Sequence, residues 1–438
     1  MLDLYSKFSP ERTPLRMLTV PHGPLGNSLH EIAEKYFLFP CLEGELESKM
    51  IFNGTKKVIW SINNYLGLGN CDKLKTAETE IKLRNGLSLP MGARMFSGDT
   101  LVQHELEAEL ADYTQKESAV LFNYGYQGMF SMIDSLLDFK DIVVYDSQSH
   151  ACILDGVRLH MGKRLSFVHN NIDNLKTLLS RATKMAEKSG GGILVISEGV
   201  FGMAGDQGRL KDIVDLKKQF QFRFLVDDAH GFGAMGITGA GTGEAQSVQD
   251  GIDLYFGTFA KAFASIGAFV SGDKHAIDFI RFGIRSQMFA KTLPNIYTET
   301  NLLRLRYARQ HPELREMLWS NVNMLQEGLK KIGFDLGATN TQVTPIFLTC
   351  SVDEGAKMMV DLRETYNVFC SGALYPVVPM GIFLLRLIPT AAHSSNDVTE
   401  TLNAFAEAKS KLDSGYYLQP LPKMVTEKLT SFKNKQNA

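Results

Sequence analysis

The sequence predicts an α/β protein, in which a large domain built on a mostly parallel sheet precedes a smaller C-terminal α+β domain. From Ser118 onward, short runs that are apolar on both faces alternate with helical or loop segments, which is typical of buried parallel strands. Beyond about Gly283 the pattern changes to amphipathic helices around a few apolar runs, as in a separate α+β unit. The length of 438 residues agrees with about two or three folding units.

Residues before the first expected strand of the sheet form an arm and one helix. Prolines punctuate residues 1–61, so we expect this N-terminal arm to wrap a surface rather than to fold as a domain. Asp99 and Thr100 then precede an amphipathic run and are typical N-capping residues. The apolar face of this helix is expected to comprise Leu106, Leu110 and Tyr113. Glu105 and Glu107 are expected to lie outside that face.

The large domain, residues 62–295, should contain the parallel sheet. Its expected strands are residues 119–122, 142–145, 193–196, 224–226 and 254–256. Ligands of such sheets bind beyond the carboxyl ends of the strands, so the residues after each run are candidates for the site. The small domain, residues 296–422, should begin with a helix near Pro312, and residues 423–438 should form a basic, flexible tail. The other elements expected in the small domain are strands at 345–348 and 383–388 and helices near 355–366 and 397–412.

Composition and charge exclude several classes of function. The formal net charge is −2, so no overall basic field is present to hold nucleic acid. Five widely spread cysteines without a C-x-x-C pair argue against a disulfide framework and a zinc site, and they favour a reduced, cytoplasmic compartment. The first thirty residues contain no apolar segment of a secretory signal. No window approaches the roughly 18 apolar residues that a transmembrane helix needs.

Chemically active residue types follow several of the expected strands. Gly125 begins a glycine turn before a helix, where free backbone N–H groups suit a phosphate, although many such turns bind no ligand. His150 follows the next run, and a lone histidine is more often structural than catalytic. Asp227 and His230 follow the run at 224–226. Burying charge there without a role is costly, and a metal site or a capped turn is the alternative.

Lys261 completes this set of residues. It stands in a small, apolar segment after the run at 254–256, and lysines in such places often form Schiff bases. Pyridoxal phosphate (PLP) needs such a lysine, an acid on its pyridine nitrogen, a phosphate cradle and a group that covers its ring. These needs are met by Lys261, by Asp227, by Gly125 with Thr258, and by His150. The sequence therefore predicts PLP as the cofactor and no metal site.

Several motifs occur in one order along the chain, namely Asn63 to Leu68, Gly92 to Arg94 with Gly98, Asp227 to His230, Gly257 to Lys261, and Arg386 ahead of Ala392 to Ser394. Together they resemble the alpha-oxoamine synthases, the family of serine palmitoyltransferase, aminolevulinate synthase, aminooxononanoate synthase and aminoketobutyrate CoA ligase. The resemblance extends from about Asn63 to Asp397 and implies the PLP-dependent transferase fold type I. Two departures are Ala260, where the family often has Ser or Gly, and Gly202, in a loop that usually reads Phe-Ser-Met.

The resemblance implies a role for each candidate site residue. Lys261 would bind the cofactor and move protons at the substrate Cα, and Asp227 would pair with the pyridine nitrogen. His230 would hydrogen-bond the ring oxygen, and His150 would stack on the ring face. The phosphate would be bound by Gly125, Tyr126 and Thr258. The carboxylate of the amino acid would be bound by Asn63 and Arg386, since a guanidinium offers bidentate geometry.

The implied activity is decarboxylative condensation of serine, glycine, alanine or cysteate with an acyl-CoA or acyl carrier protein thioester, giving an α-amino ketone. Residues 257–269 look closest to the serine palmitoyltransferase branch, which favours sphingoid or sulfonolipid base synthesis. The alternatives are a short-chain relative (glycine C-acetyltransferase or 8-amino-7-oxononanoate synthase), an aminotransferase of the same fold, and an inactive scaffold subunit, which should lack the lysine. Resemblance at Phe289 to Pro294 implies a homodimer with its active sites at the subunit interface, because the matching segment of the family reaches the phosphate site of the neighbouring subunit. This segment also has few groups of its own that justify a core position.

Overall fold

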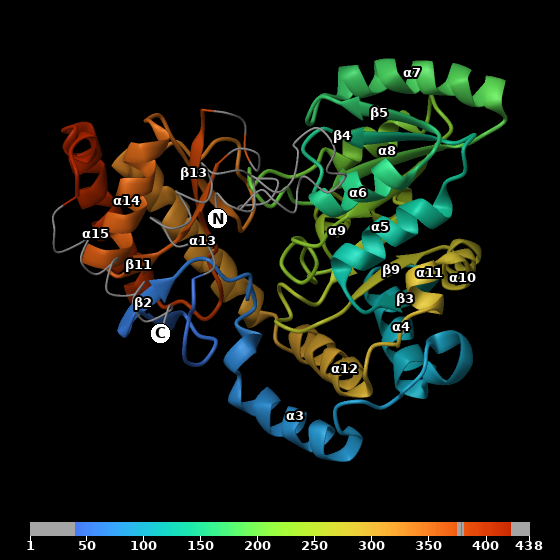
Figure 1. Cartoon of the computed structure of the whole chain (residues 1–438), viewed down its shortest axis with the longest axis horizontal. Coiled ribbons are helices and arrows are strands. Elements are labelled where there is room, and N and C mark those ends of the chain that lie inside the picture. The colour runs from blue at the N-terminus through green and yellow to red at the C-terminus, as the bar shows by residue number, and fades with distance from the viewer. Residues whose placement is uncertain (1–39, 375–377, 379–380, 422–438) are drawn as a thin grey trace, which may run out of the picture.

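The computed structural model describes residues 40–374, 378 and 381–421 (Figure 1). Elements of residues 118–288 gather on one side of the molecule, and the N-terminal hairpin lies with the C-terminal elements on the other (Figure 1). The expected tail at 423–438 and most of the expected arm lie outside the described residues. Within the described part of the chain, no helix is both long and apolar enough to cross a membrane.

A seven-stranded, mostly parallel sheet forms the centre of the large domain. In spatial order its strands are β3 (Ser118–Phe122), β9 (Ala268–Gly272), β8 (Leu254–Thr258), β7 (Arg223–Asp227), β6 (Ile193–Glu198), β4 (Ile142–Asp146) and β5 (Lys163–Phe167). β9 alone runs in the direction opposite to the other six strands. All five expected strands are confirmed. β5 was not predicted because this edge strand carries exposed polar residues, and β9 was not predicted because it follows β8 through a short hairpin.

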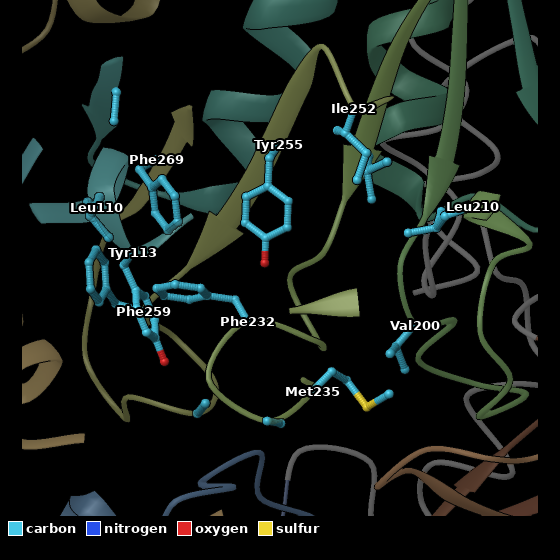
Figure 2. Close-up of a cluster of buried hydrophobic side chains, with 14 of the residues drawn as sticks. Leu110, Tyr113, Val200, Leu210, Phe232, Met235, Ile252, Tyr255, Phe259 and Phe269 are labelled. Carbon is cyan, nitrogen blue, oxygen red and sulfur yellow. The ribbon is translucent and has the colours of Figure 1, made fainter. Parts of the chain in front are cut away.

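Helices cover both faces of this sheet, which explains why its strands are apolar on both faces. One face packs against α5 (Gly125–Leu136), α6 (Ala151–Leu159) and α10 (Lys274–Gly283). The other packs against α4 (Leu101–Tyr113), α7 (Ile172–Ser189), α8 (Leu210–Leu216) and α12 (Asn295–Gln310). Aromatic rings fill part of the second face, where Phe232, Phe259 and Phe269 cluster beside Tyr255 (Figure 2). Shorter or peripheral helices are α3 (Asp72–Asn85), α9 (Thr242–Ala245) and α11 (Arg285–Met288).

The helix expected after Thr100 is confirmed as α4, and the side chain of Gln103 accepts a hydrogen bond from the Thr100 N–H at 3.1 Å. Its expected apolar residues Leu106, Leu110 and Tyr113 are all buried. The expectation for Glu107 was wrong, because its carboxylate is buried. It forms ion pairs there with Arg94 and Arg281. Two arginines from distant segments compensate this buried charge, and helical periodicity does not reveal such partners.

Most of α12 lies within the expected small domain at 296–422, but this helix was not predicted and it packs against the large sheet. The helix expected near Pro312 is confirmed as α13 (Glu313–Ile332), which begins directly after that proline, and the four further elements predicted for the small domain are present. These four are β10 (Thr344–Leu348), α14 (Val352–Thr365), β13 (Phe383–Leu387) and α15 (Ser395–Asp413). β10, β13 and β12 (Ser371–Ala373) form one sheet. A second sheet joins β11 (Val368–Phe369) to the hairpin of β1 (Lys49–Phe52) and β2 (Thr55–Ile59). The last part of the expected arm thus packs in the small-domain core, through Val58 and Trp60.

Candidate active site

Lys261 lies in the loop that joins β8 to β9. Because these strands are antiparallel, the connection is a compact hairpin, closed by a hydrogen bond of 3.0 Å from the Phe259 N–H to the Gly267 carbonyl. The Lys261 ammonium has no hydrogen bond or ion pair with any described residue. Burial lowers the pKa of Lys261, whereas the negative charges of Asp227 and Glu198 raise it. The lysine is therefore an amine without a partner beside two carboxylates.

Asp227 and Glu198 lie opposite each other at the carboxyl ends of β7 and β6. An oxygen of Asp227 accepts a hydrogen bond from the Ala229 N–H at 3.1 Å, and Glu198 accepts one from the His150 N–H at 2.5 Å. Burial and the charge of Asp227 raise the pKa of Glu198 well above its ordinary value. Sequence reasoning missed Glu198, although it ends an apolar run as Asp227 does.

His150 is the N-cap residue of α6, and its side chain is partly exposed at the edge of the site. The ring Nδ1 lies 3.0 Å from the sulfur of Cys152, which lies 3.8 Å from Asp227 Oδ2. Burial, together with the positive charge of Lys261, lowers the pKa of His150, and the charge of Asp227 opposes this. A neutral imidazole with an open face can cover a planar ring. Cys152, which sequence reasoning also missed, connects this histidine to Asp227.

His230 is buried, and its Nδ1 shares a hydrogen bond of 2.7 Å with the Tyr65 hydroxyl. Burial lowers the pKa of His230 well below its ordinary value, so the ring is neutral. Its Nε2 lies against Gly202, where an added Cβ would stand 2.3 Å from that nitrogen. The Gln342 side chain donates to the His230 carbonyl at 2.6 Å. The ring is thereby held between the segment after β2, the loop after β6 and the small domain.

The N-terminus of α5 begins at Gly125 and points unpaired backbone groups outward. Among the described residues, no acceptor is present for the N–H groups of Gly125, Tyr126 and Gln127, which suit an anion. A Cβ on Gly125 would lie 3.5 Å from the Thr258 hydroxyl, so the two residues are neighbours. The Tyr126 hydroxyl instead donates to Asp155, which raises the pKa of Tyr126 to about 12. Tyr126 is therefore expected to offer its N–H.

Arg386 and Asn63 come from the small-domain side of the site. Arg386 lies on β13 and donates from Nη1 to the Gly202 carbonyl at 2.9 Å. Its Nε and the Asn63 Oδ1 are buried and have no partner among the described residues. Burial lowers the pKa of Arg386, and leaving such a donor unpaired costs about 1–3 kcal/mol or more. An anionic ligand at this guanidinium would remove that cost.

The chemistry of this set fits PLP. The unpaired lysine, the buried carboxylate of Asp227, the neutral His150 and the open helix N-terminus supply the four groups that the cofactor needs. The roles of Lys261, Asp227, His150, His230, Gly125, Tyr126, Thr258, Asn63 and Arg386 remain predictions.

Comparison with known proteins agrees with this chemistry. The family model described as aminotransferase class I and II matches residues 55–405. Cysteate-C-fatty acyltransferase of Capnocytophaga ochracea is 54% identical over 88% of this chain and 92% of its own. Serine palmitoyltransferase of Bacteriovorax stolpii is 34% identical over 86% of this chain and 88% of its own. A serine palmitoyltransferase structure solved with PLP has a TM-score of 0.82 at 27% identity, covering 88% of this chain and 96% of its own.

The fold, the site and these relatives define a PLP-dependent enzyme of fold type I. Within that class, the chain belongs to the alpha-oxoamine synthases and is a C-acyltransferase. The alternatives of an aminotransferase activity and of an inactive scaffold subunit are not supported by these relatives.

Proposed function

We propose that the chain condenses cysteate with a long-chain fatty acyl thioester, giving a sulfonated α-amino ketone for sulfonolipid synthesis. The observation that carries this proposal is Arg386, whose buried Nε lacks a partner and is suited to the carboxylate of an amino acid. The choice of cysteate over serine is supported by the higher identity to the Capnocytophaga cysteate-C-fatty acyltransferase, 54% against 34% for a serine palmitoyltransferase.

Each residue of the site is assigned one role in this reaction. When bound, PLP supplies an electron sink for negative charge at the substrate Cα. Lys261, whose pKa burial lowers, takes the Cα proton as a neutral amine and later returns it. Arg386 and Asn63 hold the carboxylate until it leaves as carbon dioxide. A bond forms between Cα and the acyl carbon, the thioester C–S bond breaks, and the carrier leaves as a thiolate that takes a proton from water.

A substrate panel tests the proposal. Cysteate, serine, glycine and alanine are each offered with a short and a long acyl thioester, on coenzyme A and on acyl carrier protein, and carbon dioxide and free thiol are measured. We expect equal amounts of both products and the highest kcat/KM with cysteate and a long chain. A preference for serine would favour the sphingoid alternative, and a preference for glycine or alanine with a short thioester would favour the short-chain relatives.

We further propose a homodimer in the cytoplasm. Large apolar side chains exposed on one chain support a partner, namely Leu83, Leu87, Met91, Phe96, Leu101, Phe282 and Phe289. The segment after Phe289 is less free than expected, because Thr292 and Leu293 are buried and the Thr292 hydroxyl accepts from Gln103 at 2.9 Å. The five cysteines, all free thiols, support a reduced compartment.

Subunit mixing tests the shared site. Lys261→Ala and Ala290→Asp chains should each be inactive alone, and exchanged mixtures should regain activity, because some mixed dimers hold one intact site. A matched control mixes Lys261→Ala with itself after the same treatment. A fully active monomer in light scattering would contradict the proposal, as would exchange without recovered activity.

A further inference from the structure

Outside the cofactor site, a further histidine lies between two carboxylates. His169 follows β5, and its Nδ1 lies 2.9 Å from Asp146 while its Nε2 lies 2.9 Å from Asp206. Since both ring nitrogens face acceptors, the arrangement is satisfied only when both carry protons. Burial opposes this, but hydrogen bonds to Asp146 and Asp206 raise the pKa of His169 to about 9. His169, Asp146 and Asp206 together are called the ion triad below. The described residues contain no group of side chains that could hold a metal ion.

This triad fixes one end of the loop Phe201 to Asp206, which follows β6. Asp206 also accepts from the Asn170 side chain at 2.7 Å, and its carbonyl accepts from the Phe201 N–H at 3.0 Å. The Phe201 ring meets the His169 ring edge-on, with centroids 4.4 Å apart. Both ends of the loop are therefore attached to the large domain through His169.

The tip of the same loop is bound to the small domain. The Gly202 carbonyl accepts from Arg386 at 2.9 Å, and the Gly205 carbonyl accepts from the hydroxyls of Thr339 and Thr341 at 2.8 and 2.7 Å. The Gly202 bond is the only hydrogen bond from Arg386 to an oxygen of a described residue. The position of that carbonyl thus sets where the guanidinium stands.

We propose that His169 is a positioning residue for the amino-acid substrate: bound between Asp146 and Asp206, it fixes the loop whose Gly202 carbonyl orients Arg386. The inference rests on the proposed role of Arg386 as the carboxylate-binding group. It follows that disturbing His169 weakens amino-acid binding and leaves the acyl thioester unaffected, because only the amino acid presents a carboxylate to Arg386.

The test uses the holoenzyme and two substitutions in the triad. His169→Gln removes the charge, and Asp206→Asn keeps the shape of one partner but not its charge. The dissociation constant for cysteate is measured from the change in cofactor absorbance, alongside the KM for the thioester and the thermal midpoint. We expect cysteate to bind about tenfold or more weakly in both variants, at an unchanged thioester KM. The matched control is His275→Gln, on the exposed surface of α10.

Arg386→Ala separates the two ways in which the inference can fail. If Arg386→Ala weakens cysteate binding and both triad variants do not, His169 has no positioning role and the proposed function stands. If Arg386→Ala binds cysteate normally, the carboxylate role of Arg386 is wrong and the inference falls with it. A lower thermal midpoint with unchanged cysteate affinity, or an equal loss of affinity for thioester and cysteate, would also overturn it.

Discussion

The two walls of the candidate site are built differently. On the large-domain wall, Asp227 ends one strand and Lys261 and His150 each follow a strand of the same sheet, so their positions depend mainly on sheet topology. On the small-domain wall, Arg386 lies within β13 and is oriented by a carbonyl from a loop of the other domain. The large-domain wall, which would hold the cofactor and is called the cofactor wall below, is thus formed by one domain. The small-domain wall, which would bind the amino acid and is called the substrate wall, depends on how the two domains pack together.

The largest effect is expected on the cofactor wall. Lys261→Ala should abolish turnover, because Lys261 is the amine that lies beside Asp227 and Glu198 and is expected to move the Cα proton. Borohydride reduction of the unmodified holoenzyme, followed by peptide mapping, should find the cofactor label on Lys261. A label on another lysine would refute the assignment. Lys274→Ala, which alters an exposed pair with Asp278 on α10, is the matched control and should retain activity.

On the substrate wall, Arg386→Ala should cost about 2–5 kcal/mol of amino-acid binding, because the carboxylate is left unpaired in a buried place. Binding of the thioester should change little. Arg386→Lys should restore only part of the loss, since an ammonium lacks the bidentate geometry. Titration of cofactor absorbance with cysteate measures the first quantity, and equal losses for both substrates would remove the distinction between the walls.

The folding stability of the two domains should also change with pH in opposite directions. In the small domain, burial lowers the pKa of His393 to about 4, below its value near 6.5 in the unfolded chain. The neutral ring therefore contributes fully to folding stability above pH 6.5, and this contribution is lost as the pH falls to 4. The full loss is about 3 kcal/mol. His169 has a raised pKa of about 9, so its contribution is present below pH 6.5 and is lost towards pH 9. The urea midpoint of unfolding is measured against pH for each variant. His393→Gln should lack the loss of stability towards pH 4, and His169→Gln should lack the loss towards pH 9.

The smallest effect is expected where the walls touch, at Gly202. Gly202→Ala would place a Cβ 2.3 Å from His230 Nε2, so the loop or the ring must shift, at about 1–3 kcal/mol. The affinity for cysteate should fall when the loop shifts, because the Gly202 carbonyl accepts a hydrogen bond from Arg386. Gly192→Ala, whose Cβ would meet only an oxygen of Asp141 at 3.5 Å, is the control. Equal behaviour of the two variants would mean that the contact has no consequence.

Sequence reasoning found the cofactor wall because strand ends are local signals. Asp227 and Lys261 follow apolar runs, and that pattern alone pointed to them. Arg386 and Asn63 came only from the family resemblance, because no local pattern shows that a mid-strand arginine faces another domain. The Tyr65–His230 bond joins residues 165 positions apart, and the ion pairs of Glu107 join separate segments. Such contacts depend on tertiary packing, which periodicity does not report.

The hairpin of β1 and β2 gives the chain a definite order of assembly. All strands of the large sheet lie between Ser118 and Gly272, so that sheet can form while the C-terminal residues are still being synthesised. The hairpin is made earlier, yet its Lys57 ammonium bonds the Arg363 carbonyl 306 positions later, beside β11. At about 5–20 residues per second, the two strands of the hairpin wait roughly 15–60 s during synthesis for the partner that buries them. The hairpin is therefore synthesised before the large sheet but is completed after it.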